Sequence, residues 1–150
     1  MKALSLGQWV TAGLVITLSA CGGDDAPPLP SPAPCVDDID TSCSLLFSPP
    51  VYSTLYTEVI VKSCALSASC HAVGSRSSYV TFGDADATYR TLLGLDGGPK
   101  HVIPGDPQCS PMTARLESDD PNFVMPQGMK MSAPARCNFV QWIAEGAQKN

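Results

Sequence analysis

Residues 63–71 read Ser-Cys-Ala-Leu-Ser-Ala-Ser-Cys-His and hold the most distinctive chemistry of the chain. Within them, Cys70 is followed directly by His71, and Cys64 lies six positions before Cys70. A cysteine pair that ends in Cys-His is typical of c-type haem attachment, in which the thiols bond the haem vinyl groups and the imidazole binds iron. The usual motif has two residues between its cysteines, whereas this one has five.

The wider spacing leaves several interpretations open. On a regular α-helix, residues six apart point about 120° away from each other, so Cys64 and Cys70 cannot reach one haem from such a helix. Attachment of both thiols therefore predicts that residues 65–69 bulge out as a loop. Alternatively, Cys70 alone forms a thioether and Ser67 takes the place of the first cysteine, or Cys64 and Cys70 form a disulfide. A zinc site is disfavoured, because two cysteines and one histidine do not complete a tetrahedral ligand set.

The composition of the chain limits the classes of function. Its 150 residues suggest one domain after any targeting segment. The formal charge is −5 and no basic run is present, so binding to nucleic acid is not expected. Seven cysteines in so short a chain, beside a secretory signal, indicate an oxidising compartment.

The N-terminus is expected to direct the protein to the cell envelope. Residues 1–20 have the charge, the apolar stretch and the small closing residues of a secretory signal peptide. Residues 18–21, Leu-Ser-Ala-Cys, resemble the bacterial lipobox, which implies cleavage before Cys21 and acyl chains on that residue. Several acyl chains would give a stable membrane anchor. By analogy with enterobacterial sorting, Gly22 favours the outer membrane, with the domain facing the periplasm.

Residues 21–50 are predicted to be a flexible tether between the lipid and the domain. They contain half of the 14 prolines and five aspartates, a composition that cannot bury a core. Cys35 and Cys43 flank a short acidic stretch and are interpreted as a local disulfide. A calcium loop is a weaker alternative, because the stretch lacks the ligand pattern.

Residues 51–150 are predicted to form the domain, and their pattern is largely helical. The apolar residues between Tyr52 and Ile60 recur at the spacing of a helix with one buried face, and this helix leads into the cysteine motif. A short helix is expected near 87–95, and a short extended segment near 79–82. Another helix should start at Pro111 with Ser110 as its cap, and a last helix should cover about 133–147.

Several of these segments, in this order, carry a family resemblance. They are Cys-His after an amphipathic helix, Val-Ile-Pro-Gly-Asp-Pro at 102–107, Val-Met-Pro at 124–126 and Trp-Ile-Ala-Glu-Gly-Ala at 142–147. Together they resemble the cytochrome c-like domains of bacterial periplasmic and lipid-anchored proteins, over about residues 50–147. The resemblance implies a small all-α domain whose first and last helices cross, with one covalent haem c between them.

The resemblance also implies roles for individual residues. His71 would be the proximal iron ligand, and Met125, in Met-Pro, would be the distal one. Cys70 would form one thioether, and Cys64 would form the other if its loop allows. A His/Met pair would raise the reduction potential relative to two histidines.

Other residues are assigned with reference to the same pattern. Met129 and Met131 are rivals of Met125 for the distal position, whereas His101 lies outside the matched positions and is expected on the surface. The family pattern requires no cysteine at 109 or 137, so a Cys109–Cys137 disulfide is expected. Because six cysteines allow fifteen pairings, the connectivity stays open.

Two functions follow as expectations. The first is a membrane-anchored electron-transfer protein with one covalent haem and an unknown redox partner protein. The second is a haem-free, disulfide-stabilised module of cytochrome-like fold that binds or builds structure on the envelope. An enzyme is not expected, because no Ser-His-Asp set, phosphate loop or pair of catalytic carboxylates stands out.

Overall fold

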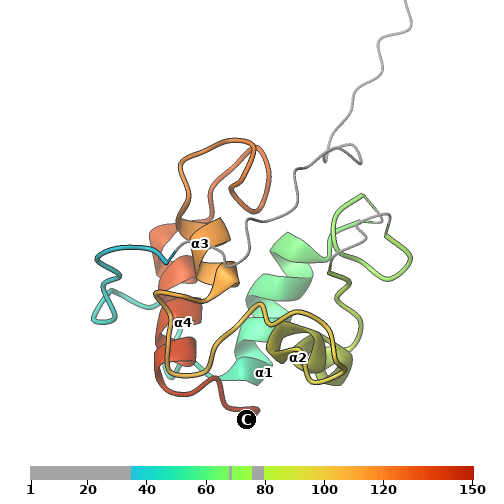
Figure 1. Cartoon of the computed structure of the whole chain (residues 1–150), viewed down its shortest axis with the longest axis horizontal. Helices are drawn as coiled ribbons and strands as arrows, with labels where there is room; N and C mark the ends of the chain where they lie inside the picture. The colour runs from blue at the N-terminus through green and yellow to red at the C-terminus, as the bar shows by residue number, and fades with distance from the viewer. Residues whose placement is uncertain (1–34, 68, 76–79) are drawn as a thin grey trace, which may run out of the picture.

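The computed structural model describes residues 35–67, 69–75 and 80–150. These residues form helices and contain no strand, so the prediction of a small all-α fold is confirmed (Figure 1). The elements are α1 (Tyr52–Leu55), η1 (Tyr56–Cys64), α2 (Ala85–Leu93), α3 (Pro111–Glu117) and α4 (Ala133–Ala144). The expected signal peptide at 1–20, the lipidation residue Cys21 and residues 22–34 lie outside the described part of the chain.

The first helix ends at the cysteine motif. α1 continues directly into the π-helical segment η1, because Leu55 and Tyr56 at the junction both have right-handed helical torsions. At the other end of η1, the Ala65 amide donates to the carbonyl of Ile60, five residues back, at 2.9 Å. Such wider turns are rare and are often found at functional sites. The predicted buried face is confirmed, and it comprises Tyr52, Leu55, Val59 and Ile60.

The first and last helices pack directly against each other. The ring centroids of Tyr52 in α1 and Trp142 in α4 are 5.5 Å apart, and both side chains are buried in one core cluster. In Figure 1, α4 and α2 lie on either side of α1. The resemblance implied a haem between the first and last helices. Between Tyr52 and Trp142, aromatic rings fill the interface of these two helices.

Local signals explain how α2 and α3 begin. The Asp84 side chain accepts a hydrogen bond from the Ala87 amide at 2.8 Å and so caps α2. Ser110 precedes α3 as expected but does not cap it with its side chain. Its hydroxyl accepts from the Ile103 amide at 2.8 Å and donates to the Asp106 carbonyl at 2.7 Å. The residue expected as a cap therefore holds the preceding turn against the start of α3.

The disulfide pairing differs from the expectation. Cys35 is bonded to Cys109, and Cys43 is bonded to Cys137, so the predicted pairs Cys35–Cys43 and Cys109–Cys137 are both wrong. All four cysteines are bridged, as predicted, but across the fold. The predicted pairs are closer in sequence than the actual ones, whose bonds span 74 and 94 residues.

The segment 35–50 lies on the domain and is not a solvated tether. The Asn138 side chain, buried in α4, accepts from the amides of Leu46 at 2.8 Å and Phe47 at 3.3 Å. It also donates to the Phe47 carbonyl at 2.7 Å. These bonds and the two disulfides explain the difference from the composition-based prediction. A polar, proline-rich segment was expected to bury nothing, yet it supplies backbone partners to a buried amide.

Candidate functional site

The residues after η1 form a loop that returns to its own start. The His71 amide donates to the Cys64 carbonyl at 3.1 Å, which brings the two ends of the motif together. Within the loop, the Cys70 amide donates to the Ser67 carbonyl at 3.0 Å. The loop that attachment of both thiols would require is therefore present in residues 65–67, 69 and 70. It places the Cys-His pair beside the end of the first helix.

The sulfurs of Cys64 and Cys70 are present as thiols and are not bonded to each other. Burial raises the pKa of the Cys64 thiol to about 12, and the nearby Cys70 adds a smaller upward contribution. That electrostatic contribution indicates that the two sulfurs lie near each other. The Ser67 hydroxyl donates to the Cys70 sulfur at 3.6 Å. Ser67 therefore lies against Cys70 at the position that the first cysteine has in the usual motif.

The His71 imidazole has a fixed orientation. Its Nδ1 lies 2.9 Å from the Val80 carbonyl, and a carbonyl can only accept, so Nδ1 carries the hydrogen and Nε2 the lone pair. Phe82 holds the residue from the other side. Its amide donates to the His71 carbonyl at 2.7 Å, and the two ring centroids are 5.3 Å apart. A backbone carbonyl on one ring nitrogen is the usual support of an imidazole that binds metal through the other.

His101 is not a surface residue, so that expectation is wrong. It is half-buried, and its Nε2 is buried without a hydrogen-bond partner among the residues that the structure describes. Burial lowers its pKa, and the nearby His71 and then Arg115 lower it further. His71 is thus one of the groups whose charge acts on His101. The sequence signal that could have indicated the burial of His101 is the apolar residue next to it, Val102, which is fully buried in the structure.

The three candidate methionines lie in different environments. Met129 is 79% exposed, whereas Met131 is 8% exposed and belongs to the core. Met125 is half-buried, and its amide donates to the carbonyl of Arg115 in α3 at 3.0 Å. The charge of Arg115 in turn acts on His101. Of the three methionines, Met125 has the environment most suited to a ligand, because its side chain is neither in solvent nor part of the core.

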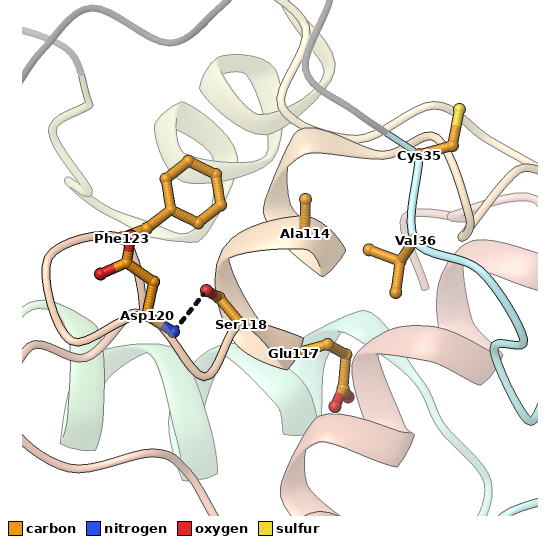
Figure 2. A pocket seen from close by; sticks show the side chains of 7 residues that line it. All are labelled: Cys35, Val36, Ala114, Glu117, Ser118, Asp120 and Phe123. Carbon is orange, nitrogen blue, oxygen red and sulfur yellow. Dashed lines mark hydrogen bonds between the residues drawn. The ribbon is translucent and has the colours of Figure 1, made fainter.

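Two cavities lie away from the cysteine motif. One of about 410 Å³ lies beside α3. Figure 2 shows its lining residues, which are Cys35, Val36, Ala114, Glu117, Ser118, Asp120 and Phe123. A second, of about 200 Å³, borders the loop between α3 and α4. Neither is lined by Cys64, Cys70 or His71, so the chemistry of the site is argued from the donor atoms.

Those donor atoms fit a covalently attached haem. Two thiols lie near each other at the ends of a loop, and the histidine that follows them is oriented by the bond between its Nδ1 and the Val80 carbonyl. A second buried imidazole, at His101, has an Nε2 that lacks a partner in the described residues. In the same part of the chain, no group of three or more His, Cys, Asp or Glu side chains is arranged for a bare metal ion.

Comparisons with known proteins assign no family to this chain. No family model, no curated protein and no solved structure matches it. None of the helices within residues 35–67, 69–75 and 80–150 is both long and apolar enough to cross a membrane.

Proposed function

We propose that this protein is a membrane-anchored electron carrier of the cell envelope that binds one covalent haem c. The single observation that carries the proposal is the His71 ring, whose Nδ1 is held 2.9 Å from the Val80 carbonyl directly after two thiols. That hydrogen bond leaves the lone pair on Nε2, the atom that would bind iron. We propose no catalytic role.

Each residue of the motif has a distinct task in this proposal. Cys70 and Cys64 would hold the haem through thioethers, and the bond from the His71 amide to the Cys64 carbonyl keeps the two ends together. His71 would be the proximal ligand, and the resemblance to cytochrome c-like domains nominates Met125 as the distal one. The haem itself supplies one-electron transfer when bound.

The location of the protein is part of the proposal. Acyl chains on Cys21 would anchor it in the outer membrane, facing the periplasm, where it would exchange electrons with a partner protein. The two disulfides support an oxidising compartment, because such bonds persist there and are rare where thiols are kept reduced. The electron partner would have to be identified by experiment.

The proposal is tested by producing the full-length chain in a bacterium with a c-type haem maturation system. The membrane fraction is run on a denaturing gel and stained for haem, and the haem is then examined as its pyridine complex. We expect haem to migrate with the chain and to resist extraction by acidified acetone. A folded, colourless wild-type protein would overturn the proposal.

Cysteine variants sharpen the same test. Cys70→Ser should abolish covalent haem, because Cys70 directly precedes the histidine. Cys64→Ser should shift the α-band of the pyridine complex if both thiols are attached, and leave it unchanged if only Cys70 is. Ser67→Ala, which removes only the hydroxyl beside the Cys70 sulfur, is the matched control and should retain haem.

A haem-free structural or binding module on the envelope is the second candidate. It is favoured by one observation, the closed packing of Tyr52 against Trp142, which gives the domain a core without any ligand. In that case the purified wild type would be colourless, and Cys64 and Cys70 would be recovered as thiols or as a third disulfide. Quantifying thiols in the denatured protein, before and after reduction, separates these outcomes.

A further inference from the structure

The cavity beside α3 has no part in the proposed haem site. Its volume is about 410 Å³, within the range of clefts that hold small ligands. It is bordered by Cys35 and Val36, the first two residues that the structure describes, and by α3 and the loop that follows α3. In Figure 2, Val36 lies on one side of Ala114 and Phe123 on the other.

The polar side chains that border this cavity already have partners within the protein. Glu117 accepts from Arg136 at 2.9 Å, and Asp120 accepts from the Asn122 amide at 2.9 Å. The Ser118 hydroxyl accepts from the Asp120 amide at 3.1 Å, the bond drawn in Figure 2. Because burying a charge without a partner is costly, the cavity suits an uncharged, apolar occupant.

The aromatic side of the cavity is held in place. The Arg115 guanidinium lies over the Phe123 ring, 4.2 Å from its centroid. Arg115 also donates to the Phe123 carbonyl at 3.1 Å. A surface that is already ordered loses less entropy on binding, and grooves with aromatic walls are the usual docking sites of proline-rich segments.

The chain itself contains a segment of the required chemistry. Residues 26–34 read Ala-Pro-Pro-Leu-Pro-Ser-Pro-Ala-Pro and include no charged residue. Proline has no backbone N–H, so burying it leaves no amide in need of an acceptor. The segment ends directly before Cys35, which borders the cavity.

The end of this segment is fixed at the cavity. Cys35 is bonded to Cys109, and the Val36 amide donates to the Gln108 carbonyl at 2.8 Å. Six residues in a polyproline II helix span about 19 Å, which is enough to cross a cavity of this volume. A segment joined so closely has an effective concentration in the mM range, so even a weak interaction would favour it over a separate molecule.

We propose that residues 29–34 fill the cavity beside α3 of the same chain. The composition of residues 35–50 also predicted a tether, yet those residues lie on the domain. The inference does not require haem. If Cys21 is acylated, as proposed above, the spacer between membrane and domain would consist of residues 22–28 alone.

The first test needs only the mature wild-type chain, studied in detergent micelles by nuclear magnetic resonance. We expect through-space contacts from the Leu29 methyl groups to the Phe123 ring and to the Val36 methyl groups. Their absence would overturn the inference. In a mixture of two differently labelled samples, contacts found only between different chains would assign the cavity to a second copy and would also overturn it.

Two matched pairs of substitutions sharpen the test. Pro30→Ser with Pro32→Ser should remove most of the intensity of the Leu29 contacts and shift the methyl signals of Val36 and Ala114. Pro27→Ser with Pro28→Ser, just outside the proposed docking segment, should leave both unchanged. Equal effects of the two pairs would contradict the inference. A folded chain without haem would fail the proposed function and leave these expectations as they are.

Discussion

Two regions of the molecule use the same kinds of side chain differently. On one side, residues 35–50 lie on α3 and α4, with all four cysteines bridged and the buried Asn138 amide hydrogen-bonded. On the other side, Cys64 and Cys70 are thiols and His101 has a buried nitrogen without a described partner. The cysteines of the first region are committed to disulfides, whereas those of the second are thiols. The difference indicates that the first region holds the fold together, and the second is where we propose that haem is attached.

The largest predicted effect concerns the bridged region. Replacing Cys43 and Cys137 by serine together should lower the free energy of unfolding by about 4–5 kcal/mol, because the bond restrains a long loop in the unfolded chain. Its two cysteines are 94 residues apart in sequence. Denaturant unfolding of the haem-free protein measures the loss. Cys64→Ser, at a cysteine outside both disulfides, is the control and should cost roughly 1 kcal/mol or less. Equal losses in the two variants would remove the contrast between the regions.

The next effect concerns the buried amide that joins the segment to α4. Asn138→Leu should lower the free energy of unfolding by about 2–4 kcal/mol, since it removes the side-chain partner of the Phe47 amide and carbonyl. It also leaves the Leu46 amide with only its longer bond to the Pro134 carbonyl, at 3.3 Å. Thermal unfolding compares this variant with Asn122→Ala, an exposed asparagine whose side chain we expect to matter by only about 0.5 kcal/mol. A change below 1 kcal/mol for Asn138→Leu would show that the Asn138 amide contributes little to holding segment 35–50 on the domain.

The buried Cys64 thiol should react slowly in the folded protein. In the haem-free Cys70→Ser variant, Cys64 should react with an aromatic disulfide reagent at pH 8 roughly 30-fold more slowly than in urea. The reason is that its raised pKa reduces the thiolate fraction, and the higher nucleophilicity of that thiolate only partly compensates. Equal rates in native and denatured protein would mean that Cys64 is not desolvated.

The same raised pKa has a consequence for stability. Because the folded protein holds the Cys64 proton more tightly than the unfolded chain, this contribution is fully present below 9.0, the ordinary pKa of the thiol in the unfolded chain. It is lost as pH rises from there towards about 12. Cys64→Ser should flatten the decline of the unfolding free energy over that alkaline range. A decline of unchanged slope would assign it to other groups.

The smallest effects are expected from ion pairs. Arg136 in α4 bonds Glu117 in α3 at 2.9 Å, with both side chains mostly shielded from solvent. Arg136→Ala should cost about 1 kcal/mol, whereas Lys62→Ala, which removes the exposed pair with Glu58, should cost at most about 0.5 kcal/mol. Unfolding at low and high salt checks both, and only the exposed pair should lose most of its small contribution in salt.

The helices could be predicted from sequence, because their signals are local. The apolar spacing from Tyr52 to Ile60 and the cap at Asp84 depend only on neighbouring residues, and both are found in the structure. The disulfide pairing could not be predicted. Whether Cys35 bonds Cys43 or Cys109 depends on where residues 35–50 lie on the folded domain. The polar composition of these residues predicted a solvated tether that does not contact the domain.

The candidate site was only partly predictable for the same reason. The Cys-His pair and the need for a loop between its cysteines follow from spacing alone. The Val80 carbonyl that supports His71 lies nine residues further along the chain, and neither this contact nor the burial of His101 has a signal in the local sequence. His101 follows a lysine and several glycines, so its local sequence resembles a surface turn. Its burial becomes visible only when the residues between α2 and α3 are placed in space.

The most direct test of the central claim is the intact mass of the mature wild-type chain, purified from cells that mature c-type haem. The account predicts a mass increased by one haem and unchanged by denaturation, with Cys64 or Cys70 modified on the peptide that contains His71. The account would be contradicted by a haem-free mass in a folded protein whose Cys64 and Cys70 are both recovered unmodified.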